Sequence, residues 1–311
     1  MSQQHAIQIR IATRADLSAI ASLARAAFTL DAFSDALLAE KLFDAPLPDA
    51  ELWQTYLAER DGRLIGFMQS VVRRGNPKAW VGLFAVDAGA RRQGIARRLF
   101  EHTRSAWPSR ITSAEILALP GNYFAPGLDP RYTTGLSFVE ALGFTRGRDC
   151  VNLSCKLWRE FDTAAEESRL TAQGIEIRRA DRRSDGPLLD AFFASDFGAD
   201  WRFEAEQALR QSPEALHLAL RPIDGQTRIV AFSAHTTQNR EWGFFGPMGT
   251  TPAARGLGLG RVLLWRCLND MRAAGHQSSV IPWVGPIRFY HDACGAVVER
   301  VFWRYQMELV R

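Results

Sequence analysis

The segment 255–261 combines glycine and arginine in a pattern that suits the binding of a phosphate group. Glycine lets the backbone approach a ligand closely, and the free N–H groups at a helix N-terminus attract anions. An apolar stripe at helical spacing follows directly, so these glycines open a helix. We therefore expect a pyrophosphate cradle. It consists of Arg255, Gly256, Leu257, Gly258, Leu259, Gly260 and Arg261.

A similar loop occurs earlier in the chain. Gly94 lies 164 positions before Gly258, and it too follows an arginine-rich turn and precedes a helical pattern. The candidates for phosphate binding in this earlier loop are Arg91, Arg92, Gln93, Gly94, Ile95 and Ala96. A weaker repeat relates 7–28 to 175–197 at an offset of 168. Two offsets of similar size indicate a tandem duplication of a whole domain.

The duplication sets the expected domain limits. The first domain covers 5–158 and the second covers 174–311. Between them, 159–173 is polar and is followed by a glycine, which is typical of a linker.

Two familiar phosphate-binding loops do not fit these glycines. A P-loop requires a lysine after its last glycine, and none follows here. A dinucleotide-binding loop requires the spacing G-x-G-x-x-G and an acidic residue at the end of the next strand. Gly256, Gly258 and Gly260 are spaced two and two, and the next predicted strand ends near Ile281-Pro282-Trp283, where there is no acidic residue.

The pattern R-x-x-G-x-G after a meander strand resembles the acyl-CoA loop of the GNAT N-acetyltransferase superfamily. It is present as Arg255-x-x-Gly258-x-Gly260 and again as Arg91-x-x-Gly94-x-Ala96. Two copies, each in the same order of elements, make nearly the whole chain similar to two GNAT domains in tandem.

This resemblance implies acetyl-CoA as the cofactor and direct attack of an amine on its thioester. It also implies that the backbone of the last meander strand in each domain, here 244–250 and 80–86, pairs with the pantetheine arm. The additional cofactor-binding candidates are Met248, Gly249, Thr250, Phe84, Ala85 and Val86.

The family's proton donor to the leaving thiolate is usually a tyrosine on the last helix. Tyr290 fits this pattern, although its spacing to Gly295 is one residue longer than usual, whereas Val139 stands at that place in the first domain. A phenol can protonate a thiolate and valine cannot. We therefore expect the second domain to be catalytic. The alternative is an active first domain in which Tyr123 or Tyr132 is the donor.

A general base is less clearly marked. Glu241 stands at the start of the strand expected to face the cofactor, and it is our candidate for the second domain. His235 on the preceding strand is a further candidate. Asp87 and Glu115 are the corresponding candidates in the first domain.

The elements that must position these residues follow the same order in both halves, which predicts a mixed α/β (α+β) fold with a mostly antiparallel sheet flanked by helices. In the first half we expect strands at 6–12, 52–60, 63–74, 78–86, 111–118 and within 144–157, and helices within 15–28, 32–42, 94–107 and 133–142. In the second half we expect a meander over 214–248, a helix to about 274, a strand at 278–283, a helix near 286–293 and strands within 296–309.

Composition narrows the class of protein. The net charge is +4 and the basic residues are spread along the chain, which is unlike a nucleic-acid-binding surface. The four cysteines match no zinc spacing, so we expect no metal. There is no signal-like start and no stretch long enough to span a membrane, so we expect a cytoplasmic protein.

The expected function is therefore acetyl-CoA-dependent acetylation of a primary amine, on a small molecule or a peptide, by a monomer or a homodimer. The alternative is a regulatory protein that binds acyl-CoA without turning it over. Fold alone does not identify the acceptor.

Overall fold

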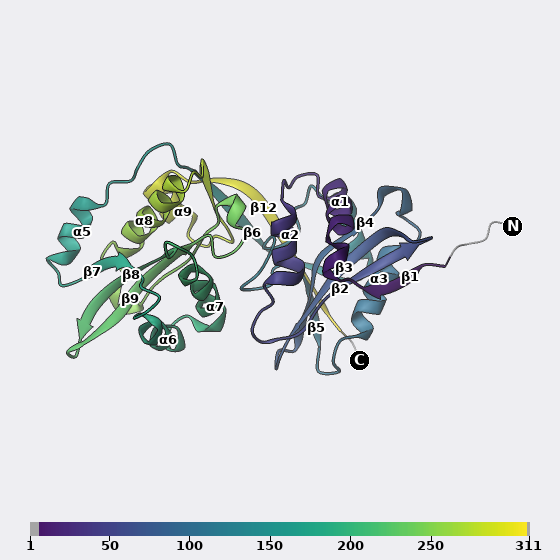
Figure 1. The fold of residues 1–311 in the computed structure, drawn as a ribbon, viewed down its shortest axis with the longest axis horizontal. Helices are drawn as coiled ribbons and strands as arrows, with labels where there is room; N and C mark the ends of the chain where they lie inside the picture. The colour runs from purple at the N-terminus through teal and green to yellow at the C-terminus, as the bar shows by residue number, and fades with distance from the viewer. Residues whose placement is uncertain (1–5, 310–311) are drawn as a thin grey trace. The chain divides into compact units, whose positions relative to one another are not determined.

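Each half of the chain is built on an antiparallel meander in the computed structural model, which describes residues 6–309 (Figure 1). The chain divides into two units. The first runs to Cys150 and takes in the residues from Val301 onward, and the second spans Val151–Arg300. Both units combine helices with β-sheet, which confirms the predicted mixed α/β class.

The sheet of the first unit is mixed. Its strands lie in the order β1, β2, β3, β4, β5 and β12, and every neighbouring pair is antiparallel except β4 and β5, which are parallel. These strands are β1 (Gln8–Ile11), β2 (Ala50–Arg60), β3 (Arg63–Arg73), β4 (Lys78–Val86), β5 (Ser113–Ile116) and β12 (Val297–Glu308), with β6 (Thr145–Lys156) next to β12.

Helices cover both faces of this sheet because its side chains alternate between them. Met68 belongs to the cluster that contains Leu99 of α3 and Val139 of α4. The neighbouring Phe67 points the other way, toward Phe28 at the end of α1. The helices are α1 (Leu17–Ala27), α2 (Asp35–Ala39) with a π-helical turn at Glu40–Asp44, α3 (Ile95–Ser105) and α4 (Thr133–Ala141).

Local signals in the sequence account for the turns. Asp61 and Gly62 both have positive φ angles, 54° and 72°, as a two-residue hairpin between β2 and β3 requires. Thr13 and Asp16 form the expected capping box ahead of α1, in which the Asp16 carboxylate accepts a hydrogen bond of 2.7 Å from the Thr13 amide.

The second unit has a four-stranded antiparallel sheet in the order β10, β9, β8, β7. Separately, β11 pairs antiparallel with residues 153–156 of β6. The elements are α5 (Ala164–Thr171), β7 (Glu176–Arg179), α6 (Gly186–Ser195), α7 (Gly198–Leu209), β8 (Leu216–Ile223), β9 (Gln226–His235), β10 (Phe245–Thr250), α8 (Leu259–Ala273), β11 (Ser278–Ile281) and α9 (Ile287–Cys294).

Alternation again places helices on both faces of β8 and β9. Leu218 and Phe232 pack with α6 and α7, whereas Ala219 and Ala231 pack with the buried stripe of α8. Figure 1 shows α6 and α7 on one side of these two strands and α8 on the other. Because α8 is packed on this sheet, its N-terminus at Leu259 is held a short loop after the end of β10 at Thr250.

Three features differ from the sequence-based expectations. The terminal segments 144–157 and 296–309 each form one long strand, β6 and β12. The expected linker contains α5, whose Leu170 is fully buried in the second unit. The chain divides into its two compact units at other positions than the predicted domain limits, because β6 and β12 each contribute residues to both units.

Within residues 6–309, every helix is too short or too polar to cross a membrane. In the same range, no cluster of His, Cys, Asp and Glu side chains has the arrangement of a metal site. All four cysteines are free thiols.

Candidate active site

The two glycine loops have the same backbone conformation. Each begins with a 3-10 turn, continues with an extended arginine (Arg91 or Arg255) and then takes a left-handed residue. That residue is Arg92, with φ 61°, in the first loop and Gly256, with φ 81°, in the second. The first loop has no glycine at the position of Gly256, and Arg92 nevertheless takes the same left-handed conformation there.

A second left-handed residue caps the helix in both loops. Gly94 has φ 78° and precedes α3, and Gly258 has φ 85° and precedes α8. Left-handed residues in such turns direct successive N–H groups into one concave surface, which binds anions. The first N–H groups of each helix also have no partner inside the helix. Both loops therefore have the backbone geometry of a phosphate cradle.

The strand before each loop has an open edge. In the first unit, pairing between β4 and β5 ends at Val81 and Ile116. Leu117 and Ala118 then take positive φ angles of 55° and 51°, which turn the chain away from β4. Phe84, Ala85 and Val86 pair with β3 on their other side.

The second unit repeats this divergence. A single parallel bridge joins Phe244 to Val280. Beyond it, Met248, Gly249 and Thr250 pair with β9. The residues predicted to meet the pantetheine arm therefore lie on an open strand edge next to the cradle in both units.

A bulge interrupts the register of both strands that are predicted to face the cofactor. It falls between Met68 and Ser70 in the pairing of β3 with β4, opposite Gly82 and Leu83. In the second unit it falls between Phe245 and Met248. Bulges bend a strand and redirect its side chains, and they are common beside active sites.

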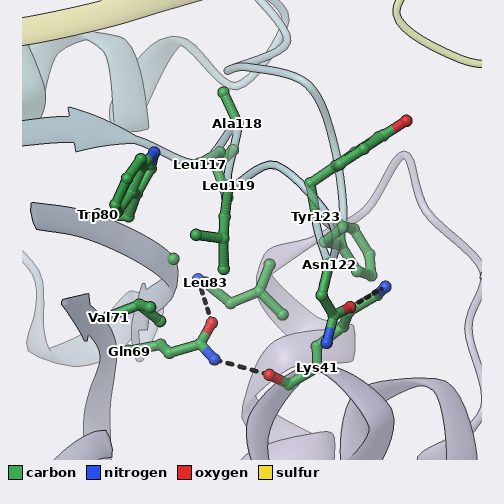
Figure 2. A pocket seen from close by; sticks show the side chains of 12 residues that line it. Lys41, Gln69, Val71, Trp80, Leu83, Leu117, Ala118, Leu119, Asn122 and Tyr123 are labelled. Atoms are coloured by element: carbon green, nitrogen blue, oxygen red, sulfur yellow. Dashed lines mark hydrogen bonds between the residues drawn. The ribbon is translucent and has the colours of Figure 1, made fainter. Parts of the chain in front are cut away.

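A cavity lies in the first unit where β4 and β5 diverge (Figure 2). The lining is mostly apolar and comes from β3, β4, the chain after β5, and the turn after α2. The lining residues are Lys41, Gln69, Val71, Trp80, Gly82, Leu83, Leu117, Ala118, Leu119, Asn122, Tyr123 and Phe124.

A network of hydrogen bonds holds the polar side of this cavity, as Figure 2 shows. Lys41 is 2% exposed, and its ammonium group donates to Asn122 Oδ1 at 2.6 Å and to Glu40 Oε1 at 2.8 Å. Gln69 Nε2 donates to the Lys41 carbonyl at 2.7 Å. The indole N–H of Trp80 is buried without a hydrogen-bond partner among the described residues. The cavity therefore has a polar end that is fixed by hydrogen bonds.

Gly82 makes room for this network. A Cβ atom on Gly82 would lie 2.1 Å from Gln69 Oε1 and 2.8 Å from its Cδ. The absence of a side chain at Gly82 allows Gln69 to lie over the strand and reach Lys41.

The two catalytic candidates of the second domain, Tyr290 and Glu241, do not line the cavity described above. Tyr290 is 9% exposed and its ring packs against Phe245 and Phe289, with centroid distances of 6.0 and 5.0 Å. Burial raises the pKa of the Tyr290 phenol above its ordinary value. Glu241 is exposed in a 3-10 turn before β10, at the opposite end of that strand from the cradle. Neither placement adds support for a catalytic role.

The other candidates have structural partners. Asp87 accepts hydrogen bonds from the Gly89 amide at 2.9 Å and from Arg63 at 2.8 Å. Glu115 is 2% exposed and is paired with Lys78 and Arg304.

His235 is buried in the second unit, 3.4 Å from Asp270. That position lies on the face covered by α8. Asp270 is on the last turns of this helix, far along it from the cradle at Gly258.

The two tyrosines of the first unit differ in their contacts. Tyr132 donates a hydrogen bond to Asp31 Oδ2 at 2.5 Å and accepts one from the Leu30 amide at 2.9 Å. Tyr123 lines the cavity, and its hydroxyl points away from Gln69 and Lys41 (Figure 2). Only Tyr123 of these two is part of the cavity wall described above.

Sequence reasoning missed Lys41, Gln69 and Asn122. A signal for Lys41 was present, because Leu38, Lys41 and Leu42 are spaced as one helical face, which buries a charge between two leucines. A buried lysine needs polar partners. Gln69 and Asn122 carry no local pattern, since they meet Lys41 only through the tertiary fold.

A family model for the acetyltransferase (GNAT) family matches the chain twice, at residues 17–110 and 187–296. Each match contains one cradle and the meander before it. Among curated proteins, no sequence matches the chain significantly.

Solved structures share the tandem fold. A fungal multi-domain GH3 beta-N-acetylglucosaminidase contains a glucosamine N-acetyltransferase region that matches with a TM-score of 0.81 and 15% identity over 97% of this chain, which covers 38% of that chain. A GCN5-related N-acetyltransferase from Sphaerobacter thermophilus matches with a TM-score of 0.71 and 19% identity, covering 97% of this chain and 95% of the other.

A tandem GNAT protein from the clavulanic acid biosynthesis pathway matches with a TM-score of 0.70 and 16% identity, covering 97% of this chain and 98% of the other. Identities this low establish a common fold. They do not show that this chain catalyses the reactions of those proteins.

Proposed function

The chain belongs to the acetyltransferase (GNAT) family, and from this we propose that it transfers an acetyl group from acetyl-CoA to the primary amine of a small molecule or peptide, using the first unit as the catalytic one. The family indicates acyl transfer in general. The choice of acetyl-CoA, of an amine acceptor and of the first unit is our proposal.

One observation supports this choice above the others: a cradle, an open strand edge and a cavity are consecutive in the first unit. The cradle at Arg91–Ala96 follows directly after the open edge at Phe84–Val86. The cavity begins at Gly82 and Leu83 on the same strand. A coenzyme whose pyrophosphate lies at the cradle and whose arm follows β4 would bring its thioester to the cavity.

Acetyl-CoA supplies the activated thioester, and the protein must then orient an amine and manage two protons. The cradle amides and Arg91 would hold the pyrophosphate. The cavity walls would exclude water and hold the acceptor. Tyr123 is the tyrosine in the cavity wall, and we propose it as the proton donor to the thiolate.

The test measures release of the CoA thiol from acetyl-CoA with a panel of amines, beside calorimetric titration with acetyl-CoA. We expect binding, and thiol release with at least one amine. Tight binding without thiol release from any amine would instead favour a regulatory acyl-CoA-binding protein. An absence of binding would remove the proposal altogether.

A further inference from the structure

The helix α5 lies against the N-terminal half of α8 in the second unit. Leu170 of α5 is fully buried in one cluster with Leu259 and Val262 of α8. Two ion pairs flank this contact. Glu166 Oε1 lies 2.6 Å from Arg261 Nη2, and Glu167 Oε2 lies 2.6 Å from Arg266 Nη2.

Glu166 and its neighbour Arg169 lie at the entrance of the second cradle. Arg169 Nη2 donates to the Leu257 carbonyl at 2.7 Å and to Glu166 Oε2 at 2.8 Å. A Cβ atom on Gly258, the capping glycine of α8, would lie 3.1 Å from Arg169 Nη2 and 4.0 Å from Glu166 Oε2. The carboxylate of Glu166 therefore lies between two arginines beside the loop that has the geometry of an anion site.

The first cradle has no such cover in the described part of the chain. Within residues 6–309, neither Arg91 nor Arg92 forms an ion pair, and Arg91 Nε donates to the Val86 carbonyl at 3.2 Å. The two cradles thus share their backbone conformation, but side chains of α5 cover only the second one among the described residues.

We propose that α5 is a latch that closes the second cradle, with the carboxylate of Glu166 in place of a phosphate of CoA and paired with Arg261. The chain then binds CoA at the first cradle and binds it at the second only when α5 moves. Occupancy of the first cradle rests on the proposed function, whereas closure of the second does not.

The latch is weak enough to open. The side chains of Glu166, Arg169 and Arg261 are 26%, 43% and 44% exposed. Ion pairs this exposed contribute little to stability, since water and salt screen them. Leu170 keeps α5 on the second unit, so the release we expect is a local movement of one helix.

The test is calorimetric titration with CoA, in the full chain and in a Gly94→Asp background that blocks the first cradle. We expect one site in the wild type and none in the Gly94→Asp chain. Glu166→Ala should restore one site to the Gly94→Asp chain, with CoA affinity raised roughly tenfold or more, because Arg261 is then free to form charge-assisted hydrogen bonds.

Glu167→Ala is the matched control, since it removes the neighbouring ion pair and leaves the cradle covered. It should add no site. Two sites in the wild type would overturn the proposal, as would no gain with Glu166→Ala or an equal gain with Glu167→Ala. No site in the wild type but one with Glu166→Ala would support the latch and contradict CoA binding by the first unit.

Discussion

Arg304 on β12 donates a hydrogen bond of 2.7 Å through Nε to the buried carboxylate of Glu115 on β5. The two residues are 189 positions apart in the chain, and the contact joins the C-terminal strand to the sheet of the first unit. Lys78 on β4 completes the pairing at 2.7 Å. The negative charge of Glu115 is thus held by two strands that flank its own.

Arg304→Met should lower the free energy of unfolding by about 2 kcal/mol, because the carboxylate of Glu115, which is 2% exposed, loses one of its two ion-pair partners. Urea denaturation measures this. The double variant Glu115→Leu with Arg304→Met should recover most of the loss, since no buried charge is left alone. An unchanged midpoint in the single variant would show that the pair contributes nothing.

Gly94→Asp should abolish CoA binding at the first cradle. The substitution places a negative charge where the pyrophosphate would lie, and a non-glycine residue at φ 78° costs roughly 1–2 kcal/mol. Gly258→Asp imposes the same backbone strain at φ 85° in the second loop and is the matched control. Calorimetry should show CoA binding retained in Gly258→Asp, and the reverse result would assign binding to the second unit.

Gly82→Ala should push Gln69 off the strand, because the new Cβ would lie 2.1 Å from Gln69 Oε1. Overpacking by the new methyl group, together with the loss of the hydrogen bond from Gln69 to the Lys41 carbonyl, should lower the free energy of unfolding by about 1–3 kcal/mol. In a Gln69→Ala background, where the clashing side chain is absent, Gly82→Ala should leave the free energy of unfolding nearly unchanged. A double-mutant cycle in urea measures this coupling, and strictly additive effects would contradict it.

Local signals were sufficient for much of the fold. The strand predicted at 78–86 is β4, and the turn at Asp61-Gly62 has its expected conformation. The two cradle loops open helices as their glycines predict. These features depend on residues adjacent in the chain, so pattern and turn chemistry determine them.

The rest depends on contacts that no local pattern encodes. Nothing near Arg304 in the sequence indicates that β12 pairs with β5, and nothing near Glu166 indicates that it meets Arg261 across 95 positions. The phenol of Tyr290 matches a catalytic motif in sequence, but its ring lies in the core of the second unit. Burial of that kind becomes visible only when the elements are packed.

The stability of the second unit should fall as the pH is lowered from 7 to 5. His217 is 2% exposed, and burial lowers its pKa below the ordinary 6.5 although its hydrogen bond to Asp270 opposes the shift. The unfolded chain therefore binds a proton in this range that the folded chain does not, so stability rises with pH by up to about 1.4 kcal/mol per unit.

Urea denaturation at several pH values measures this slope. Asp270, whose pKa is lowered, loses its stabilising charge only as the pH falls below the ordinary carboxyl range, so it does not contribute between pH 5 and 7. His217→Gln should reduce the slope of the unfolding free energy against pH, by an amount that corresponds to at most one proton taken up on unfolding. An equal slope in the variant and the wild type would assign the dependence to other groups.

Tyr123→Phe and Tyr290→Phe form a matched pair that tests which unit is catalytic. Tyr123 lines the cavity where β4 and β5 diverge, so loss of its hydroxyl should lower kcat about 100-fold with CoA affinity unchanged. Tyr290 contributes its ring to a core cluster, so Tyr290→Phe should keep both kcat and the unfolding midpoint. A large loss of kcat in Tyr290→Phe with Tyr123→Phe unaffected would move catalysis to the second unit, and it would require α5 to leave the second cradle during turnover.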